Sequence, residues 1–252
     1  MLKFTTTIIL FLIGVLTQAQ VTENRTIAAF SKIEVQNGIT LVHALAANHS
    51  AKVIINDSES LSNIATETKN GVLKIYTVDN NPVKDVTVYV NINNVTGLTA
   101  SGKSLISLPQ AVETRNMDIV LSSGSKFTGL LRSKMRTTLK VSDNAVFDGR
   151  VETTRLSAYF TDNAKVNLSG TADDAYVSTA NNALLLARNL ETKYATVFSS
   201  DWSAVTIYSG HNMMINVSDL AKVTYTGEPK NVRLNEEALA TVRKTDSLLA
   251  NE

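Results

Sequence analysis

The stretch VSDNAVFDG at residues 141–149 returns, with small changes, as FTDNAKVNLSG at residues 160–170. Both contain a small residue, one variable residue and then an apolar residue of the kind that is usually buried. The same triplet occurs eight times between residues 104 and 242, and its apolar members lie 18 to 21 residues apart. These members are Ile106, Phe127, Phe147, Val166, Leu185, Val205, Val223 and Val242. The pattern predicts eight copies of one structural unit.

A short polar corner precedes the first seven triplets. Ser142–Asn144 and residues 180–182 are typical, with Asp-Asn or Asn-Asn after a small residue. Gly and Asn tolerate a positive φ, and Asp and Ser bond their own backbone, so we expect each corner to be a tight turn. Between corners the apolar residues alternate, as at Leu139 and Val141, which is typical of strands.

A period near 20 residues built from strands predicts a β-solenoid. The L-x-x-L-x-L core of leucine-rich repeats, a five-residue period and the G-G-x-G-x-D nonapeptide are all missing. The solenoid type that remains is a parallel β-helix of about eight coils, each with about three short strands. Coils stacked ~4.8 Å apart would pair each inward residue with its equivalents above and below. We therefore expect the eight apolar residues to form one ladder inside an all-β protein, a class that the low aromatic content of 6% also favours.

The N-terminal part has a different pattern. It predicts strands at residues 30–35, 39–42, 53–55, 71–76 and 86–90, a hairpin turn at Asn70-Gly71, and a short helix or turn at residues 58–68 capped by Ser58. We expect residues 20–97 to form a β module that covers the first coil of a β-helix domain at residues 98–244. Residues 245–252 are a tail. Near it, Val242 fits an eighth rung, while residues 236–249 could instead form a capping helix.

Residues 1–19 have the features of a secretory signal peptide. Lys3 is followed by an apolar run from Ile8 to Leu16, and Thr17 and Ala19 fit the cleavage site. A membrane anchor is the alternative, but the run is shorter than the ~20 residues of a spanning helix. We expect an exported protein, in the periplasm, on the outer-membrane surface or outside the cell, with no membrane insertion after cleavage.

Composition excludes several kinds of site. The chain has no cysteine, so disulfides, thiolate metal sites and a cysteine nucleophile are ruled out. Without Lys3 the chain has 23 basic and 23 acidic residues, which gives no electrostatic reason to expect nucleic acid or an anionic membrane as partner.

Catalytic motifs are missing as well. The histidines His43, His49 and His211 are far apart and match no metal-binding spacing. There is no G-x-S-x-G, P-loop or G-x-G-x-x-G. We therefore expect no catalytic residue, no metal site and no cofactor.

The polar corners are the first candidate binding surface. Asp143, Asn144, Asp162, Asn163 and Asp201 should lie along one edge of the rod, ~5–6 Å apart in adjacent coils. Stacked carboxylates repel each other, and a cation or the hydroxyls of a sugar would relieve that repulsion. The alternative is that these residues serve turn geometry and are well solvated. An enzyme using this Asp cluster would need a basic partner among Arg132, Arg136, Arg150 and Arg155.

Aromatic residues are the second candidate. Trp202, the only tryptophan, sits in a corner next to Asp201, where an exposed ring could stack on a sugar; alternatively it folds over the neighbouring coil. Tyrosines recur about once per coil outside the ladder and could be partly exposed. They are Tyr159, Tyr176, Tyr194, Tyr208 and Tyr225.

The sequence resembles a known family. The segments FSKIEVQNGITLVH, KNGVLKIYTVDN and VTGLTASGKSLISL, followed by the coils, are similar to the GIN domain, the head domain of auto-transporter adhesins, over residues 28–244. Here Asp-Asn, Asn-Asn or Asp-Trp replaces the Ser-Gly-Ala-Ser pattern that is usual in the family's coils. The resemblance implies a right-handed β-helix in the cell envelope and names no binding residue.

These observations favour a non-catalytic, exported interaction module that binds a glycan or an envelope protein through one long face. A carbohydrate-active β-helix lyase or hydrolase with an Asp-based site is one alternative, and a purely structural envelope protein is another. The sequence does not predict the oligomeric state.

Overall fold

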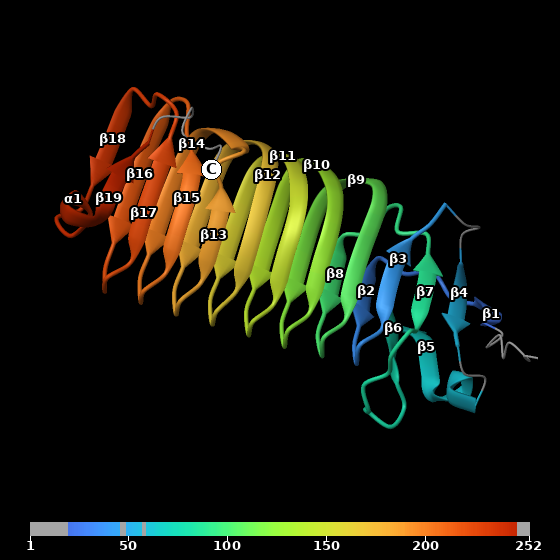
Figure 1. The fold of residues 1–252 in the computed structure, drawn as a ribbon. Helices are drawn as coiled ribbons and strands as arrows, with labels where there is room; N and C mark the ends of the chain where they lie inside the picture. The colour runs from blue at the N-terminus through green and yellow to red at the C-terminus, as the bar shows by residue number, and fades with distance from the viewer. Residues whose placement is uncertain (1–19, 46–48, 57–58, 246–252) are drawn as a thin grey trace, which may run out of the picture.

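The computed structural model describes residues 20–45, 49–56 and 59–245 of the chain. Its nineteen described strands belong to one sheet, which coils on itself into a parallel β-helix (Figure 1). The predicted all-β class and β-helix are confirmed, with about seven turns in place of eight.

Parallel pairing joins each coil to its neighbours along the rod. In β10, a register shift between Ser133 and Arg136 marks the bend where the strand turns from one face of the coil to the next. The strands of the coils are β9 (Leu105–Leu121), β10 (Lys126–Val141), β11 (Val146–Phe160), β12 (Lys165–Thr179), β13 (Leu184–Ala187), β14 (Leu190–Ser199), β15 (Ala204–Tyr208), β16 (Asn212–Val217), β17 (Lys222–Thr226), β18 (Asn231–Leu234) and β19 (Val242–Lys244).

The predicted interior ladder is confirmed in all eight positions. Each member is buried and lies opposite the next in register, from Ile106 beside Phe127 to Val223 beside Val242. The rings of Phe127 and Phe147 stack with centroids 4.7 Å apart, close to the strand spacing. The sequence repeat thus places similar apolar residues above each other in adjacent coils, and their stacking forms the core.

The polar corners are tight turns, as predicted. Their two central residues have positive φ, and in one of them the Ala145 N–H donates to the Ser142 carbonyl at 3.0 Å, the pattern of a type I′ turn. The Asn144 N–H also donates to the Asp162 carbonyl of the next coil at 2.9 Å. We call these seven turns, together with a similar turn at residues 37–38, the corner row; it follows the lower edge of the rod in Figure 1. Its central residues are 37–38, 102–103, 123–124, 143–144, 162–163, 181–182, 201–202 and 219–220.

The N-terminal strands enter the solenoid out of sequence order. β2 pairs in parallel with both β6 and β8, and β3 pairs with both β7 and β9. The ladder is extended at this end because Leu41 lies between Val88 and Ile106. The elements are β1 (Val21–Thr26), β2 (Lys32–Val35), β3 (Thr40–His43), β4 (Ser50–Ile55), η1 (Glu59–Asn63), β5 (Ile64–Lys69), β6 (Val72–Thr77), β7 (Thr87–Val90) and β8 (Gly97–Ala100). The predicted division at residues 97/98 stays a prediction.

Five predicted N-terminal strands are present, and the hairpin at Asn70-Gly71 is confirmed by positive φ at both residues. The helix or turn predicted at residues 58–68 is wrong in its second half. A 3-10 helix covers Glu59–Asn63, and Ile64–Lys69 is a strand because it pairs antiparallel with β6 across the hairpin. Ser58, the expected cap, lies outside the described residues. Strands β1 and β8 were not predicted.

The two ends of the rod are covered differently. At the N-terminal end, β4 pairs antiparallel with β7, and β1 pairs with β4. At the C-terminal end, a one-turn helix, α1 (Ala238–Thr241), buries Ala238, and Val242 then forms the last rung. Both alternatives predicted for this end, an eighth rung and a capping helix, are therefore present, and the helix is shorter than predicted. None of the helices in the described residues has the length and hydropathy of a membrane-spanning segment; the expected signal peptide at residues 1–19 lies outside these residues.

Candidate functional site

All six binding residues predicted from the sequence lie on the corner row. Asp143-Asn144 and Asp162-Asn163 occupy adjacent corners. Asp201-Trp202 lies two coils further along, beyond the corner of Asn181. The structure thus places the six residues on one edge, as two groups.

The corner carboxylates of Asp143, Asp162 and Asp201 already have hydrogen-bonding partners. The Asn181 amide donates to Asp162 Oδ1 at 2.9 Å and so separates the Asp162 corner from that of Asp201. The hydroxyls of Ser142 and Ser200 donate to the carboxylates of Asp143 and Asp201 at 3.0 and 2.7 Å. In the described part of the chain, no three His, Cys, Asp or Glu side chains are grouped so as to hold a metal ion. Turn geometry accounts for these residues without a bound cation.

Three of the four arginines that an Asp-based enzyme would need are paired with other carboxylates. Arg132 contacts Glu152 at 3.0 Å and Glu113 at 3.5 Å, and Arg150 contacts Glu152 at 2.9 Å. Arg136 contacts Asp118 at 3.5 Å. Hydrogen bonds from Arg150 and Arg132 hold the pKa of Glu152 below its usual value, which favours a permanent carboxylate over a general acid. None of these ion pairs involves the corner row.

Trp202 does not fold over the neighbouring coil: 69% of its surface is exposed. Its φ is +63°, in the left-handed region that bulky side chains avoid. Leu220, in the next corner, is also exposed and has a φ of +62°. Gly or Asn occupies this position in most of the other corners, for example Asn182. Two exposed apolar side chains are thus held in a conformation that costs stability.

Three aromatic rings form a connected strip on the outer face of the sheet next to the corner row. Tyr159 of β11, Tyr176 of β12 and Phe198 of β14 have ring centroids 5.8 and 5.6 Å apart in sequence order. Their exposed fractions are 42, 38 and 37%. We call these three residues the aromatic strip. Two of its members are predicted tyrosines, and the third, Phe198, was missed.

The remaining predicted tyrosines have different surroundings. Tyr194 is 43% exposed, and its ring meets that of His211 edge to face, with centroids 5.4 Å apart. Tyr208 is half-buried, and Tyr225 packs against the core. The five tyrosines, which recur about once per coil, therefore do not form a single row of exposed rings.

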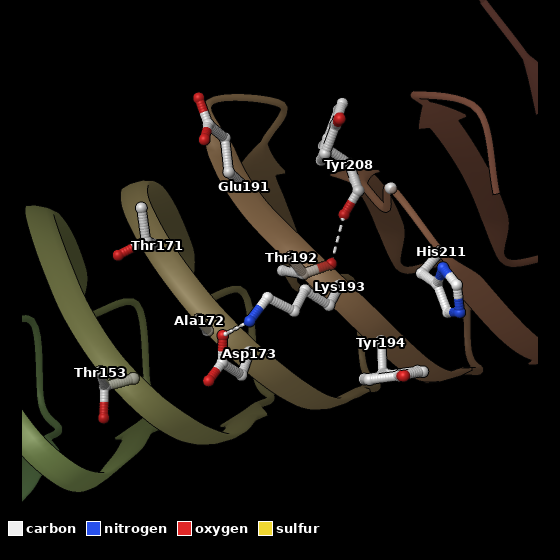
Figure 2. A pocket seen from close by; sticks show the side chains of 11 residues that line it. Thr153, Thr171, Ala172, Asp173, Glu191, Thr192, Lys193, Tyr194, Tyr208 and His211 are labelled. Carbon is white, nitrogen blue, oxygen red and sulfur yellow. Dashed lines mark hydrogen bonds and ion pairs between the residues drawn. The ribbon is translucent and has the colours of Figure 1, made fainter.

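A hollow of about 620 Å³ lies at another bend of the coils, beside Tyr194 (Figure 2). Figure 2 shows Asp173 and Lys193 pointing toward each other, and their charged groups are 2.7 Å apart. The Asp173 carboxylate raises the pKa of Lys193, so the ammonium stays protonated. We call this space the Tyr194 hollow; its other lining residues are Thr153, Thr171, Ala172, Glu191, Thr192, Tyr208, Gly210 and His211.

A second hollow of about 380 Å³ lies beside the Tyr194 hollow. Tyr194 lines both, and the second one continues past Thr196 and Met214. Thr196 lies opposite Tyr176 in register, between that ring and Met214. Tyr194 and Phe198 stand on the same outward side of β14 as Thr196, so the strip and the two hollows belong to one face of the coil. Sequence reasoning missed the hollow because its residues come from four coils and share no motif.

Comparisons with known proteins agree with this architecture. The model of the family described as "Putative auto-transporter adhesin, head GIN domain" matches residues 29–229. A search of curated proteins found no relative.

Several solved structures have the same fold at low sequence identity. A putative adhesin from Parabacteroides merdae ATCC 43184 has a TM-score of 0.79 at 15% identity, covering 90% of this chain and 96% of its own. A putative lipid binding protein from Parabacteroides distasonis ATCC 8503 has a TM-score of 0.76 at 16% identity, with 90% and 96% covered. A putative adhesin from Bacteroides fragilis NCTC 9343 has a TM-score of 0.63 at 15% identity, with 91% and 96% covered.

Proposed function

Because this chain belongs to the family of auto-transporter adhesin head GIN domains, we propose that it is a non-catalytic, adhesin-like binding module whose ligand is a glycan. The glycan lies along the aromatic strip, with Trp202 at the adjoining edge. The proposal includes export by the signal peptide at residues 1–19, which places the module in the cell envelope or outside the cell.

The aromatic strip is the observation that carries the proposal. A sugar ring has an apolar face of C–H groups, which packs on the flat face of an aromatic side chain. Three rings in sequence along the rod, 5.8 and 5.6 Å apart, offer such faces to a chain of sugars more readily than to a single one. Because the rings stand on parallel strands of a rigid sheet, little conformational entropy is lost on binding.

Trp202 supports the same role. Its left-handed backbone is a strained conformation for a bulky side chain, and strain of this kind clusters at functional sites. Asp201, the preceding residue, provides a carboxylate that can accept hydrogen bonds from sugar hydroxyls.

Other functions have less support. An Asp-based lyase or hydrolase would need an arginine near the corner carboxylates, but Arg132 and Arg150 are paired with Glu152. An envelope protein as partner would contact the same strip. A lipid is another candidate ligand, because one structural neighbour is described as a lipid binding protein. A purely structural role would leave the exposed Trp202 without a purpose.

A glycan-array screen of residues 20–252 tests the proposal. We expect saturable binding to a glycan, reduced by Trp202→Ala and Asp201→Ala at the corner. Binding to no glycan would contradict the proposal and would favour a protein partner or a structural role.

A further inference from the structure

The Tyr194 hollow has the features of a selective subsite, which the flat aromatic strip lacks. It combines an exposed ring, three threonines and three charged side chains within about 620 Å³. Ligand pockets are typically concave, of roughly this size, with a few polar groups that fix orientation. A ligand that lies along the strip can reach it, because Phe198 of the strip and Tyr194 stand on the same outward side of β14.

Charge in the hollow is unbalanced. Asp173 is neutralised by Lys193 at 2.7 Å, and both side chains are largely exposed. Glu191 lines the same hollow and adds a second carboxylate, with no further lysine or arginine among the lining residues. The hollow therefore has an excess of one negative charge and attracts a cationic group.

Aromatic groups at one end of the hollow strengthen this preference. The face of an exposed tyrosine attracts a cation through its quadrupole and also packs on C–H groups. Tyr194 is held in place by the edge-to-face contact with His211. Figure 2 shows Glu191 and Tyr194 at opposite ends of the hollow, so a chain of amino sugars would pack one ring on Tyr194 and direct the ammonium group of another unit toward Glu191.

We propose that the Tyr194 hollow is a subsite for a sugar with a free amino group, such as a glucosamine unit. This inference rests on the proposed function, since it assigns selectivity to a glycan already lying on the aromatic strip. The subsite distinguishes a charged amino sugar from its neutral N-acetyl form, because acetylation removes the ammonium that Glu191 attracts.

Isothermal titration with two oligosaccharides tests the proposal: the hexamer of glucosamine and the hexamer of N-acetylglucosamine, at pH 6 and low ionic strength. For wild type we expect the glucosamine hexamer to bind about three- to fivefold more tightly, which is the size of an exposed charge interaction. Glu191→Gln should abolish this difference, while Glu236→Gln, the same change at an exposed position outside the hollow, should keep it. High salt should also reduce it.

A further variant separates this proposal from the proposed function. Tyr176→Ala on the strip should weaken both hexamers equally, because both pack on the rings. Three outcomes would overturn the proposed subsite. The preference for the glucosamine hexamer could persist in Glu191→Gln, wild type could bind both hexamers equally, or wild type could bind neither. In each of these cases a glycan found on the array and lost in Tyr176→Ala would still support the proposed function.

Discussion

The backbone N–H of Trp202 donates to the carbonyl of Asp219 in the next coil at 3.1 Å, so a strained tryptophan is held in register within the corner row. The five preceding corners, from that of Lys103 to that of Asn182, make the same bond, for example from Asn182 to Asp201. The corner thus keeps its shape while the side chain is free to face solvent.

Replacing Trp202 by Asn should therefore stabilise the fold. Asn tolerates the left-handed region, so we expect the free energy of unfolding to rise by about 1 kcal/mol in Trp202→Asn. The matched control is Asn182→Trp, which should lower it by a similar amount. Urea unfolding followed by circular dichroism measures both; a destabilised Trp202→Asn would show that packing of the indole outweighs backbone strain.

Two equivalent inward serines should respond differently to alanine. Ser104 Oγ is buried without a hydrogen-bond partner, whereas Ser125 Oγ donates to the Ala100 carbonyl at 2.9 Å and accepts from the Ser122 N–H at 3.1 Å. We expect Ser104→Ala to be neutral or stabilising, because alanine fits this position in other coils such as that of Ala145. Ser125→Ala should cost about 1–3 kcal/mol. Equal losses in thermal or urea unfolding would contradict this account.

Stability should also fall at mildly acidic pH because of His43. The side chain is buried, and its Nδ1 accepts the Ile92 N–H at 3.2 Å, which requires the neutral ring. Burial lowers the pKa of His43 below its ordinary 6.5, and the hydrogen bond to the Val90 backbone offsets this only in part. The unfolded chain therefore binds more protons below pH 6.5, so His43 contributes stability that is present above that pH and is lost as the pH falls.

The measurement is the free energy of unfolding of wild type and His43→Gln between pH 5 and 8. The difference between the two proteins should shrink as the pH falls below about 6.5. A constant difference between wild type and His43→Gln across this range would exclude His43 as the titrating group.

The stacked pair Phe127 and Phe147 tests the ladder itself. With centroids 4.7 Å apart and an interplanar angle of 2°, the two rings should couple by about 0.5–1.5 kcal/mol in a double-mutant cycle to leucine. Additive losses would show that the rings contribute only as separate buried groups.

The sequence predicts those parts of the fold that a short repeated pattern of residues determines. The ladder was predictable because a parallel coil places residues about one period apart directly above each other, as with Phe147 and Val166. The insertion of β2 between β6 and β8 was not, because it is decided by pairings between segments that are distant in sequence. No local sequence pattern indicates that these strands pair in an order other than their order along the chain.

The candidate site was predictable only in part, for the same reason. Trp202 and the corner residues follow a turn motif, so the sequence placed them on one edge. Phe198 could have been found, since Val197 and Ser199 beside it point inward and alternation leaves the ring outside. Asp173 and Lys193 come from different coils at an irregular bend, and only the three-dimensional structure brings them together.

The measurement that tests the central claim most directly is titration of a glycan found on the array into wild type and strip variants. We expect Tyr176→Ala and Phe198→Ala to weaken binding by about 1–2 kcal/mol, or roughly 5- to 30-fold in Kd. Val120→Ala is the control, because Val120 is exposed in the same outward row as Tyr159 two coils away and is not aromatic. It should bind like wild type. Unchanged affinity in both ring variants, or an equal loss in Val120→Ala, would contradict a binding role for the aromatic strip.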